Sequence, residues 1–242
     1  MLFAVSSLKA QTFPVPKFSV HVYGGYTLCL PDLKGSFPLD VNSLKNPTPY
    51  FVNGGFNFGV DGKYFIDKKR TFGGVLSFMY TGLSSGNITF STDPIFGTGT
   101  FKTDLNIFTI GVGAEYDFAP KRPANPFVNA QFTTNMFSGT TAITSNVDGG
   151  TFNGDLKSAV RFGAQFGAGV DVKLSKKLGV ILGGRYCFQN LFNKDSTTSA
   201  SGSYGLNDIA TTTQKARKIA YLQFFAGISF YFGQATRTPI KK

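Results

Sequence analysis

The chain has 242 residues, enough for one domain, and it contains no run of about 18 apolar residues, which excludes a membrane-spanning helix. It has 27 phenylalanines, 10 tyrosines and 29 glycines but only 15% charged residues, a composition typical of an all-β protein. The formal net charge is +11, yet the cations are not clustered on a helix or interleaved with stacking aromatics, so we expect no nucleic-acid partner.

Alternation of apolar and polar residues predicts eight strands along the chain. In the first strand, over residues 17–28, the apolar Val20 and Val22 alternate with His21 and Tyr23. The same pattern predicts strands over residues 50–66, 71–84, 100–118, 126–138, 159–174, 178–188 and 217–232.

The hairpin over residues 159–188 shows the two faces most clearly. One face carries Phe162 and Phe166, whereas the other mixes glycine with the charged Arg161, Asp171 and Arg185. Its arms are longer than the roughly five or six residues usual for a soluble strand. A face of glycine and charge suits a narrow lumen better than a solvated surface, so the pattern predicts a membrane barrel whose apolar face meets lipid.

The connections between these strands alternate between long and short. Three short turns, near residues 67–70, 119–125 and 175–177, alternate with four long connections, which include a Gly/Thr/Ser loop near Pro94 and a polar loop through Asp148. An up-and-down barrel with both termini on one side sorts its loops in this way. We therefore expect an eight-stranded antiparallel up-and-down transmembrane β-barrel with short periplasmic turns and long extracellular loops.

A soluble lipocalin-like barrel is the alternative fold. It would bury the large apolar residues that the membrane barrel turns toward lipid. The residues that distinguish the two folds are Phe162, Phe166, Phe224 and Phe230.

The closing strand ends in aromatic residues and reads YLQFFAGISFYF over residues 221–232. This strand and the pattern over residues 17–232 resemble the small OmpA/OmpX-like outer-membrane barrels of Gram-negative bacteria. The resemblance implies a location in the bacterial outer membrane and recognition of the last strand by the barrel-assembly machinery. Members often stop at the final aromatic, whereas this chain continues with a tail too short to be the peptidoglycan-binding domain of some relatives.

The chain is expected to divide into three parts. Residues 1–10 resemble the end of a secretory signal peptide, with Ala10 before a plausible cleavage point. Residues 11–232 form the outer-membrane β-barrel, and residues 233–242 form a short basic C-terminal tail.

A polar network is expected inside the barrel. The three charged residues of the 159–188 hairpin are expected to partner the carboxylates of Asp61, Glu115 and Asp117, because buried polar groups must satisfy one another. The predicted members are His21, Asp61, Lys63, Glu115, Asp117, Arg161, Asp171 and Arg185.

His21 is the only histidine and therefore the natural candidate for a general base. It lacks a placed nucleophile and an orienting acid, so we expect a structural role and no catalytic residue. Cys29 and Cys187 have no metal-binding spacing, and a strand between theirs would hold them beyond the roughly 7 Å limit of a disulfide. We expect free thiols, no metal site and no cofactor.

A basic rim is expected at the periplasmic turns, facing anionic headgroups or an acidic partner. Solvated turn lysines with no partner are the alternative interpretation. The predicted rim consists of Lys68, Lys69, Arg70, Lys121, Arg122, Lys176 and Lys177.

These observations favour a non-enzymatic outer-membrane protein with a structural or interaction role through its extracellular loops and basic rim. Expected partners are outer-membrane lipids, including lipopolysaccharide, with another envelope protein as a further candidate. Two alternatives stay open: a narrow pore or small-ligand conduit, and a lipid-modifying enzyme.

Overall fold

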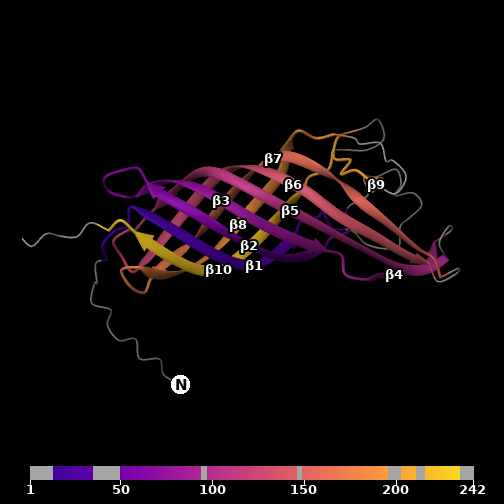
Figure 1. Cartoon of the computed structure of the whole chain (residues 1–242), viewed down its shortest axis with the longest axis horizontal. Helices are drawn as coiled ribbons and strands as arrows, with labels where there is room; N and C mark the ends of the chain where they lie inside the picture. Colours follow the sequence, from indigo (N-terminus) through magenta and orange to yellow (C-terminus); the bar gives the residue numbers. More distant parts are fainter. Residues whose placement is uncertain are drawn as a thin grey trace, which may run out of the picture.

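The structure is a computed structural model that describes residues 13–34, 50–93, 97–145, 149–195, 203–210 and 216–234. The predicted signal remnant lies outside the described residues, as does the C-terminal tail beyond Gln234. No described helix is long and apolar enough to span a membrane. The strands, shown in Figure 1, are β1 (Phe18–Cys29), β2 (Gly54–Phe65), β3 (Phe72–Ser84), β4 (Ile88–Asp93), β5 (Gly97–Asp117), β6 (Ala124–Ser145), β7 (Thr151–Lys173), β8 (Leu178–Phe192), β9 (Ser203–Tyr204) and β10 (Ala220–Phe232).

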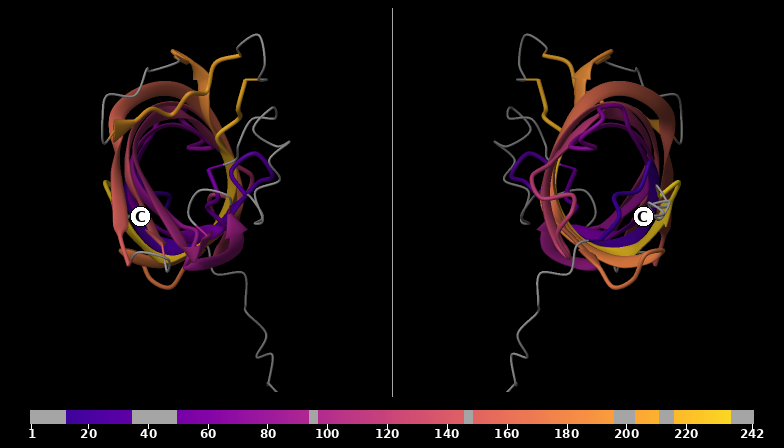
Figure 2. Two further views of the ribbon diagram at one scale, coloured as in Figure 1. Left: turned by 90° about the vertical axis from the view of Figure 1, so that its right-hand side faces the viewer. Right: turned by 90° about the vertical axis from the view of Figure 1, so that its left-hand side faces the viewer.

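Eight of these strands close into a ring, which Figure 2 shows end-on. Neighbours pair antiparallel in the order β3-β2-β1-β10-β8-β7-β6-β5, and the pairing of β3 with β5 closes the sheet. The first and last barrel strands pair along their whole length, from Phe18 opposite Phe232 to Cys29 opposite Tyr221. Within the ring, closure leaves no unpaired strand edge, which a barrel in lipid requires. The predicted up-and-down barrel is confirmed.

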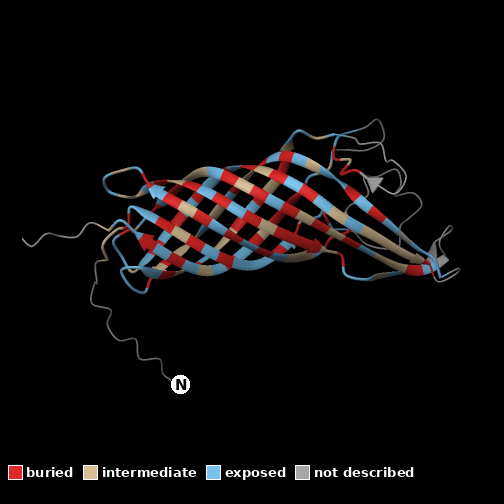
Figure 3. Ribbon diagram, in the orientation of Figure 1, coloured by how far each residue is buried: buried red, intermediate tan, exposed pale blue. Residues whose placement is uncertain are grey.

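Burial alternates along the barrel strands, as the bands in Figure 3 show. The large apolar side chains lie outside: Phe166 is 57% exposed and Phe224 52%, and Phe162 and Phe230 are also exposed. The inward positions instead hold the buried polar and charged side chains, together with buried apolar ones such as Met79, Phe127 and Phe225. This arrangement is the reverse of a soluble barrel, so the lipocalin-like alternative is wrong.

The three short turns lie together at one end of the barrel, on the left in Figure 1, and we call this the turn end. The chain also enters β1 and leaves β10 there, because the backbone N–H of Lys17 donates to the Phe232 carbonyl at 2.9 Å. The opposite end, the loop end, carries the long connections.

Three of the predicted long loops contain strand, and one of them, the connection between β8 and β10, holds the short β9. The Gly/Thr/Ser loop includes β4, which pairs with β5. The polar loop is largely a hairpin, because β6 and β7 stay paired from Gly139 opposite Leu156 to Thr144 opposite Thr151. Thr-rich segments have a high β propensity and pair well even where both faces meet water. Strands β5, β6 and β7 therefore project beyond the ring at the loop end (Figure 1).

Two adjacent glycines in β1 allow a test of how closely β1 and β10, the first and last barrel strands, approach each other. A Cβ at Gly25 would lie 1.8 Å from the Phe224 carbonyl oxygen of β10, whereas a Cβ at Gly24 would meet nothing closer than 3.5 Å. We expect Gly25→Ala to lower the free energy of unfolding by about 1–3 kcal/mol, because backbone must move to admit the methyl group. Urea unfolding in lipid vesicles measures this effect. Gly24→Ala is the matched control, with an expected change below about 0.5 kcal/mol; equal losses in both variants would contradict the close approach of β1 and β10.

Candidate functional site: the lumen and its two ends

The lumen is built from the inward positions of the barrel strands. All eight residues predicted for the polar network are buried. They divide into four groups rather than one network: Arg185 with Asp61, Lys63 with Glu115 and Asp117, His21 with Asp171 through a serine, and Arg161 with carboxylates at the loop end.

In the middle of the barrel, Arg185 of β8 pairs with Asp61 of β2. Arg185 Nη2 lies 2.9 Å from Asp61 Oδ2, and both side chains are nearly inaccessible to water. Tyr23 of β1 bridges them, since its hydroxyl donates to Asp61 Oδ1 at 2.9 Å and accepts from Arg185 Nη1 at 3.0 Å. The guanidinium also lies over the rings of Tyr23 and Phe225, 5.2 and 5.1 Å from their centroids. Both charges are thus hydrogen-bonded as well as paired, which a buried ion pair needs.

Toward the turn end, Lys63 of β2 lies between two carboxylates of β5. Its Nζ is 2.6 Å from Glu115 Oε1 and 3.0 Å from Asp117 Oδ2. Asn125 and Asn129 of β6 donate to Asp117 and Glu115 respectively, at 2.7 and 3.1 Å. The cross-strand register explains this grouping, because Glu115 and Asn129 are direct partners in β5 and β6.

His21 lies between two hydroxyls. Its Nδ1 is 2.8 Å from Ser229 Oγ and its Nε2 is 3.0 Å from Ser19 Oγ. Ser229 Oγ donates to Asp171 Oδ1 at 2.8 Å, and the Tyr231 hydroxyl donates to the same oxygen at 2.6 Å. Because the Ser229 proton goes to Asp171, His21 donates from Nδ1, which lets Nε2 accept from Ser19. Both ring nitrogens are therefore engaged in a hydrogen-bond chain among buried groups.

Arg161 departs from the prediction. It does not pair with Asp61, Glu115 or Asp117; its Nη2 instead lies 3.0 Å from Asp208 Oδ1 and 2.6 Å from Asp195 Oδ1. Arg161 lies where β7 enters the ring at the loop end, so carboxylates from the β8–β10 connection reach it first. Asp171 likewise has no cation partner among its hydrogen bonds, because hydroxyls satisfy it.

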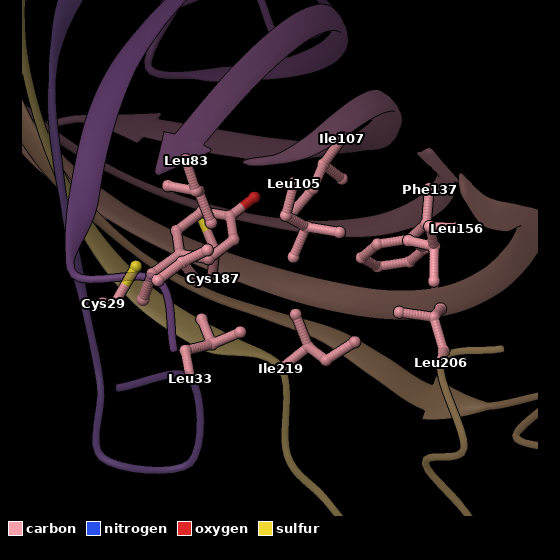
Figure 4. Close-up of a cluster of buried hydrophobic side chains, with 12 residues drawn as sticks. Cys29, Leu33, Leu83, Leu105, Ile107, Phe137, Leu156, Cys187, Leu206 and Ile219 are labelled. Carbon is pink, nitrogen blue, oxygen red and sulfur yellow. The ribbon is translucent and has the colours of Figure 1, made fainter. Parts of the chain in front are cut away.

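A cluster of apolar side chains fills the loop end of the ring, as Figure 4 shows. The cluster joins strands on opposite sides of the ring, such as β3 and β8, to residues of the connections. It lies on the loop-end side of the Arg185 and Lys63 groups. Its members are Cys29, Leu33, Val52, Leu83, Leu105, Ile107, Phe137, Leu156, Cys187, Leu206, Ile219 and Tyr221.

Sequence reasoning missed this cluster, although a signal was present. The inward positions of β5 turn from Thr109 to the apolar Ile107 and Leu105 at the loop end of the ring, where Leu83 of β3 is also apolar. A lumen that stayed polar would have no reason for that change. Leu206 comes from an irregular connection, whose contacts no periodicity predicts, whereas Ile219 has the inward parity of the strand predicted over residues 217–232.

The two cysteines are free and buried, as predicted. Cys29 and Cys187 pair in register with the same residue, Tyr221 of β10, one from each side. Two strand spacings of about 4.8 Å separate their Cα atoms, which exceeds the reach of a disulfide. In the part of the chain that the structure describes, no three His, Cys, Asp or Glu side chains are grouped so that they could hold a metal ion.

The seven predicted rim residues all lie in the three turns of the turn end. Arg70 is half-buried and donates to the carbonyl of Val15; the other six side chains are exposed: Lys68, Lys69, Lys121, Arg122, Lys176 and Lys177. The segment before β1 runs across this end, since the Phe13 N–H donates to the Lys121 carbonyl at 3.1 Å and Lys17 directly precedes β1. The segment before β1 therefore contacts both the β2–β3 turn, through Arg70, and the β5–β6 turn, through Lys121.

Asp67 is the acidic residue of the first rim turn. Partial burial acts to raise the pKa of its carboxyl, but hydrogen bonds from Phe72 and Thr71 outweigh this and hold the pKa below its usual value. The carboxylate accepts from the backbone N–H groups of Thr71 and Phe72 and from the Thr71 hydroxyl. Its lone pairs are thus used inside the turn, while the neighbouring lysines stay free to face a ligand.

Comparison with known proteins agrees with this architecture. A sequence model of the outer membrane protein beta-barrel domain matches residues 1–216. Neisserial surface protein A is 15% identical, with 89% of this chain and 97% of that chain covered and a TM-score of 0.48. OprG of Pseudomonas aeruginosa is 11% identical (93% and 99% covered, TM-score 0.48), and Ail of Yersinia pestis is 11% identical (88% and 99%, TM-score 0.39). No curated protein matches the sequence. The chain belongs to the outer-membrane protein β-barrel family and is a protein of the bacterial outer membrane.

Proposed function

We propose that this chain is a non-enzymatic outer-membrane protein that works through contacts made at its two ends. The closed barrel anchors it, the projecting sheet at the loop end serves as the extracellular contact surface, and the basic rim at the turn end contacts anionic groups on the periplasmic side. The aromatic-ended β10 is the segment that the barrel-assembly machinery would recognise.

The observation that carries this proposal is the sheet extension, made of residues 88–93, 97–103, 139–145, 151–159 and 203–204. Pairing of β3 with β5 ends at Asp104, yet β5 continues paired with β6, and β6 with β7, beyond the ring. Strand β4 widens the extension on one side and β9 on the other. A stiff, hydrogen-bonded surface raised above a closed lumen suits recognition better than passage of a solute.

Shortening the hairpin tests the extracellular part. Replacing residues 140–155 with Asn-Gly joins Gly139 to Leu156 by a two-residue turn and keeps their pairing in β6 and β7. Cross-linking on intact cells, followed by quantification of the proteins bound to the chain, is the readout. We expect the shortened chain to fold and to lose its extracellular contacts; an unchanged set of bound proteins would contradict the proposal.

A rim variant gives the matched experiment at the other end. Lys121 and Arg122 are exposed, and only the backbone of Lys121 takes part in the contact with Phe13. Lys121→Gln with Arg122→Gln should reduce periplasmic contacts and leave the extracellular ones intact. If neither variant changes any contact, the barrel has no interaction role through these surfaces.

The non-enzymatic part rests on the surroundings of His21. Both its ring nitrogens are used by Ser19 and Ser229, and the side chain is only 3% exposed. We expect cells that carry His21→Ala to have the lipid composition of cells that carry the unaltered chain. A change in lipid composition that Ser229→Ala reproduces would instead identify this chain of groups as catalytic.

A further inference from the structure

The outer wall of the barrel carries a hollow near the turn end. It has a volume of about 480 Å³ and is formed by β1, β2, β3 and β5 on the face that meets lipid. Its lining is almost entirely carbon. A volume of this size lies within the roughly 300–1,000 Å³ of small-molecule sites.

Two outward glycines form the hollow. Gly62 of β2 and Gly74 of β3 occupy positions where neighbouring outward residues are large, since Gly62 pairs with Leu76 and Gly74 with Tyr64. A Cβ at Gly62 would have no neighbour within 3.7 Å, and one at Gly74 none within 3.9 Å. Neither glycine is required by crowding, in contrast to Gly25. The missing side chains leave a groove in the wall.

Aromatic side chains border the groove on the side of the turn end, and lysines lie in the chain segments next to them. Phe18 and Tyr64 line it, and Lys17 Nζ lies 5.5 Å from the centroid of the Tyr64 ring. Lys68 and Lys69 are exposed in the turn that follows β2. The Asp67 carboxylate between them and the strand accepts hydrogen bonds within the turn. The apolar lining of the groove is thus followed, toward the turn end, by positively charged side chains.

We propose that this groove binds one acyl chain of an anionic phospholipid of the periplasmic leaflet, with the headgroup phosphate at Lys17, Lys68 and Lys69. The carbon lining excludes a polar ligand, and the position on the lipid-facing wall makes hydrocarbon the occupant already at hand. The lysines lie where the headgroups of the leaflet at the turn end lie, and they complement phosphate charge. The headgroup part rests on the proposed contact function, because Lys68 and Lys69 belong to the basic rim, whereas the acyl-chain part does not.

Filling the groove tests the acyl-chain part. Gly62→Leu with Gly74→Leu places side chains in the hollow without a backbone clash. The control is Gly184→Leu. Gly184 is an outward glycine of β8, across the ring from β3. A Cβ at Gly184 would also have room, with no neighbour within 3.6 Å. Native mass spectrometry of the full chain in uncharged detergent, titrated with phosphatidylglycerol, measures the retained lipid. We expect the double variant to bind about tenfold more weakly, equivalent to about 1.4 kcal/mol, and the control to bind as the unaltered chain does.

Removing charge tests the headgroup part in variants whose changes are confined to the exposed surface. Lys17→Gln, Lys68→Gln and Lys69→Gln should each weaken phosphatidylglycerol binding about fivefold. Lys176→Gln is the control, since its turn joins β7 and β8 across the ring from β2 and β3. Equal binding of phosphatidylcholine and phosphatidylglycerol would overturn the headgroup assignment. If the double glycine variant binds phosphatidylglycerol as well as the unaltered chain does, the site is wrong. If the unaltered chain forms dimers and only the double glycine variant does not, the groove is instead an interface between two copies.

Discussion

Arg185→Met is expected to lower the free energy of unfolding of the barrel by about 3–5 kcal/mol. The substitution leaves the Asp61 carboxylate, which is buried in the middle of the lumen, without a cation. Only the Tyr23 hydroxyl would still donate to it. Urea unfolding in lipid vesicles, followed by far-ultraviolet circular dichroism, measures the loss.

Two comparisons make that result specific to the pair. Replacing both residues, with Arg185→Met and Asp61→Leu, removes the unpaired charge and should restore most of the lost stability. Lys102→Met breaks the exposed pair of Lys102 with Asp104 outside the ring, 2.9 Å apart, and should cost less than about 1 kcal/mol. If Arg185→Met costs no more than Lys102→Met, the lumen contains enough water to screen the pair and the packed interior is wrong.

Lys63→Met should have an effect of similar size at the turn end of the lumen. Glu115 and Asp117 share the single Lys63 ammonium, so its loss leaves two buried carboxylates facing each other. A loss of about 3–5 kcal/mol lowers the unfolding midpoint of a chain of this size by about 10 °C. The temperature at which the compact band disappears in gel electrophoresis reports this midpoint.

Neutral amides at the two acidic positions provide the rescue. Glu115→Gln and Asp117→Asn, combined with Lys63→Met, keep the hydrogen-bonding shapes and remove both charges, so the midpoint should recover most of the way. Lys157→Met, at an exposed position of β7, controls for the loss of a lysine. If the midpoint stays low in the triple variant, the loss of stability comes from the lost packing of the Lys63 aliphatic chain and not from the unpaired carboxylates.

The barrel could be predicted from the sequence because alternation reports directly on which face of a strand meets lipid. Phe166 and Arg161 illustrate this, since their parity along β7 places one outside and the other inside. The lengths of β5, β6 and β7 could not be predicted in the same way. Beyond the ring both faces of a strand meet water, so segments such as residues 139–145 lose the contrast on which the prediction depends.

The sequence predicts which polar residues face the lumen better than it predicts which of them form ion pairs with each other. Inward parity placed Asp61, Lys63 and Arg185 in the lumen, but parity says nothing of height along the barrel axis. The height of a residue along the barrel axis depends on the strand register. The shear of the strands then determines which inward side chains face each other across the lumen. Asp208 had no periodic pattern around it, so its pairing with Arg161 required the fold.

Planar-bilayer conductance tests the central claim, that the lumen is closed by the apolar cluster at the loop end and filled below it by paired polar groups. The purified full chain is predicted to give no steady ion current. Leu105→Ser with Ile107→Ser, which places hydroxyls in the cluster, is the variant most expected to admit ions. A steady current through the unaltered chain would contradict the closed lumen and favour the pore.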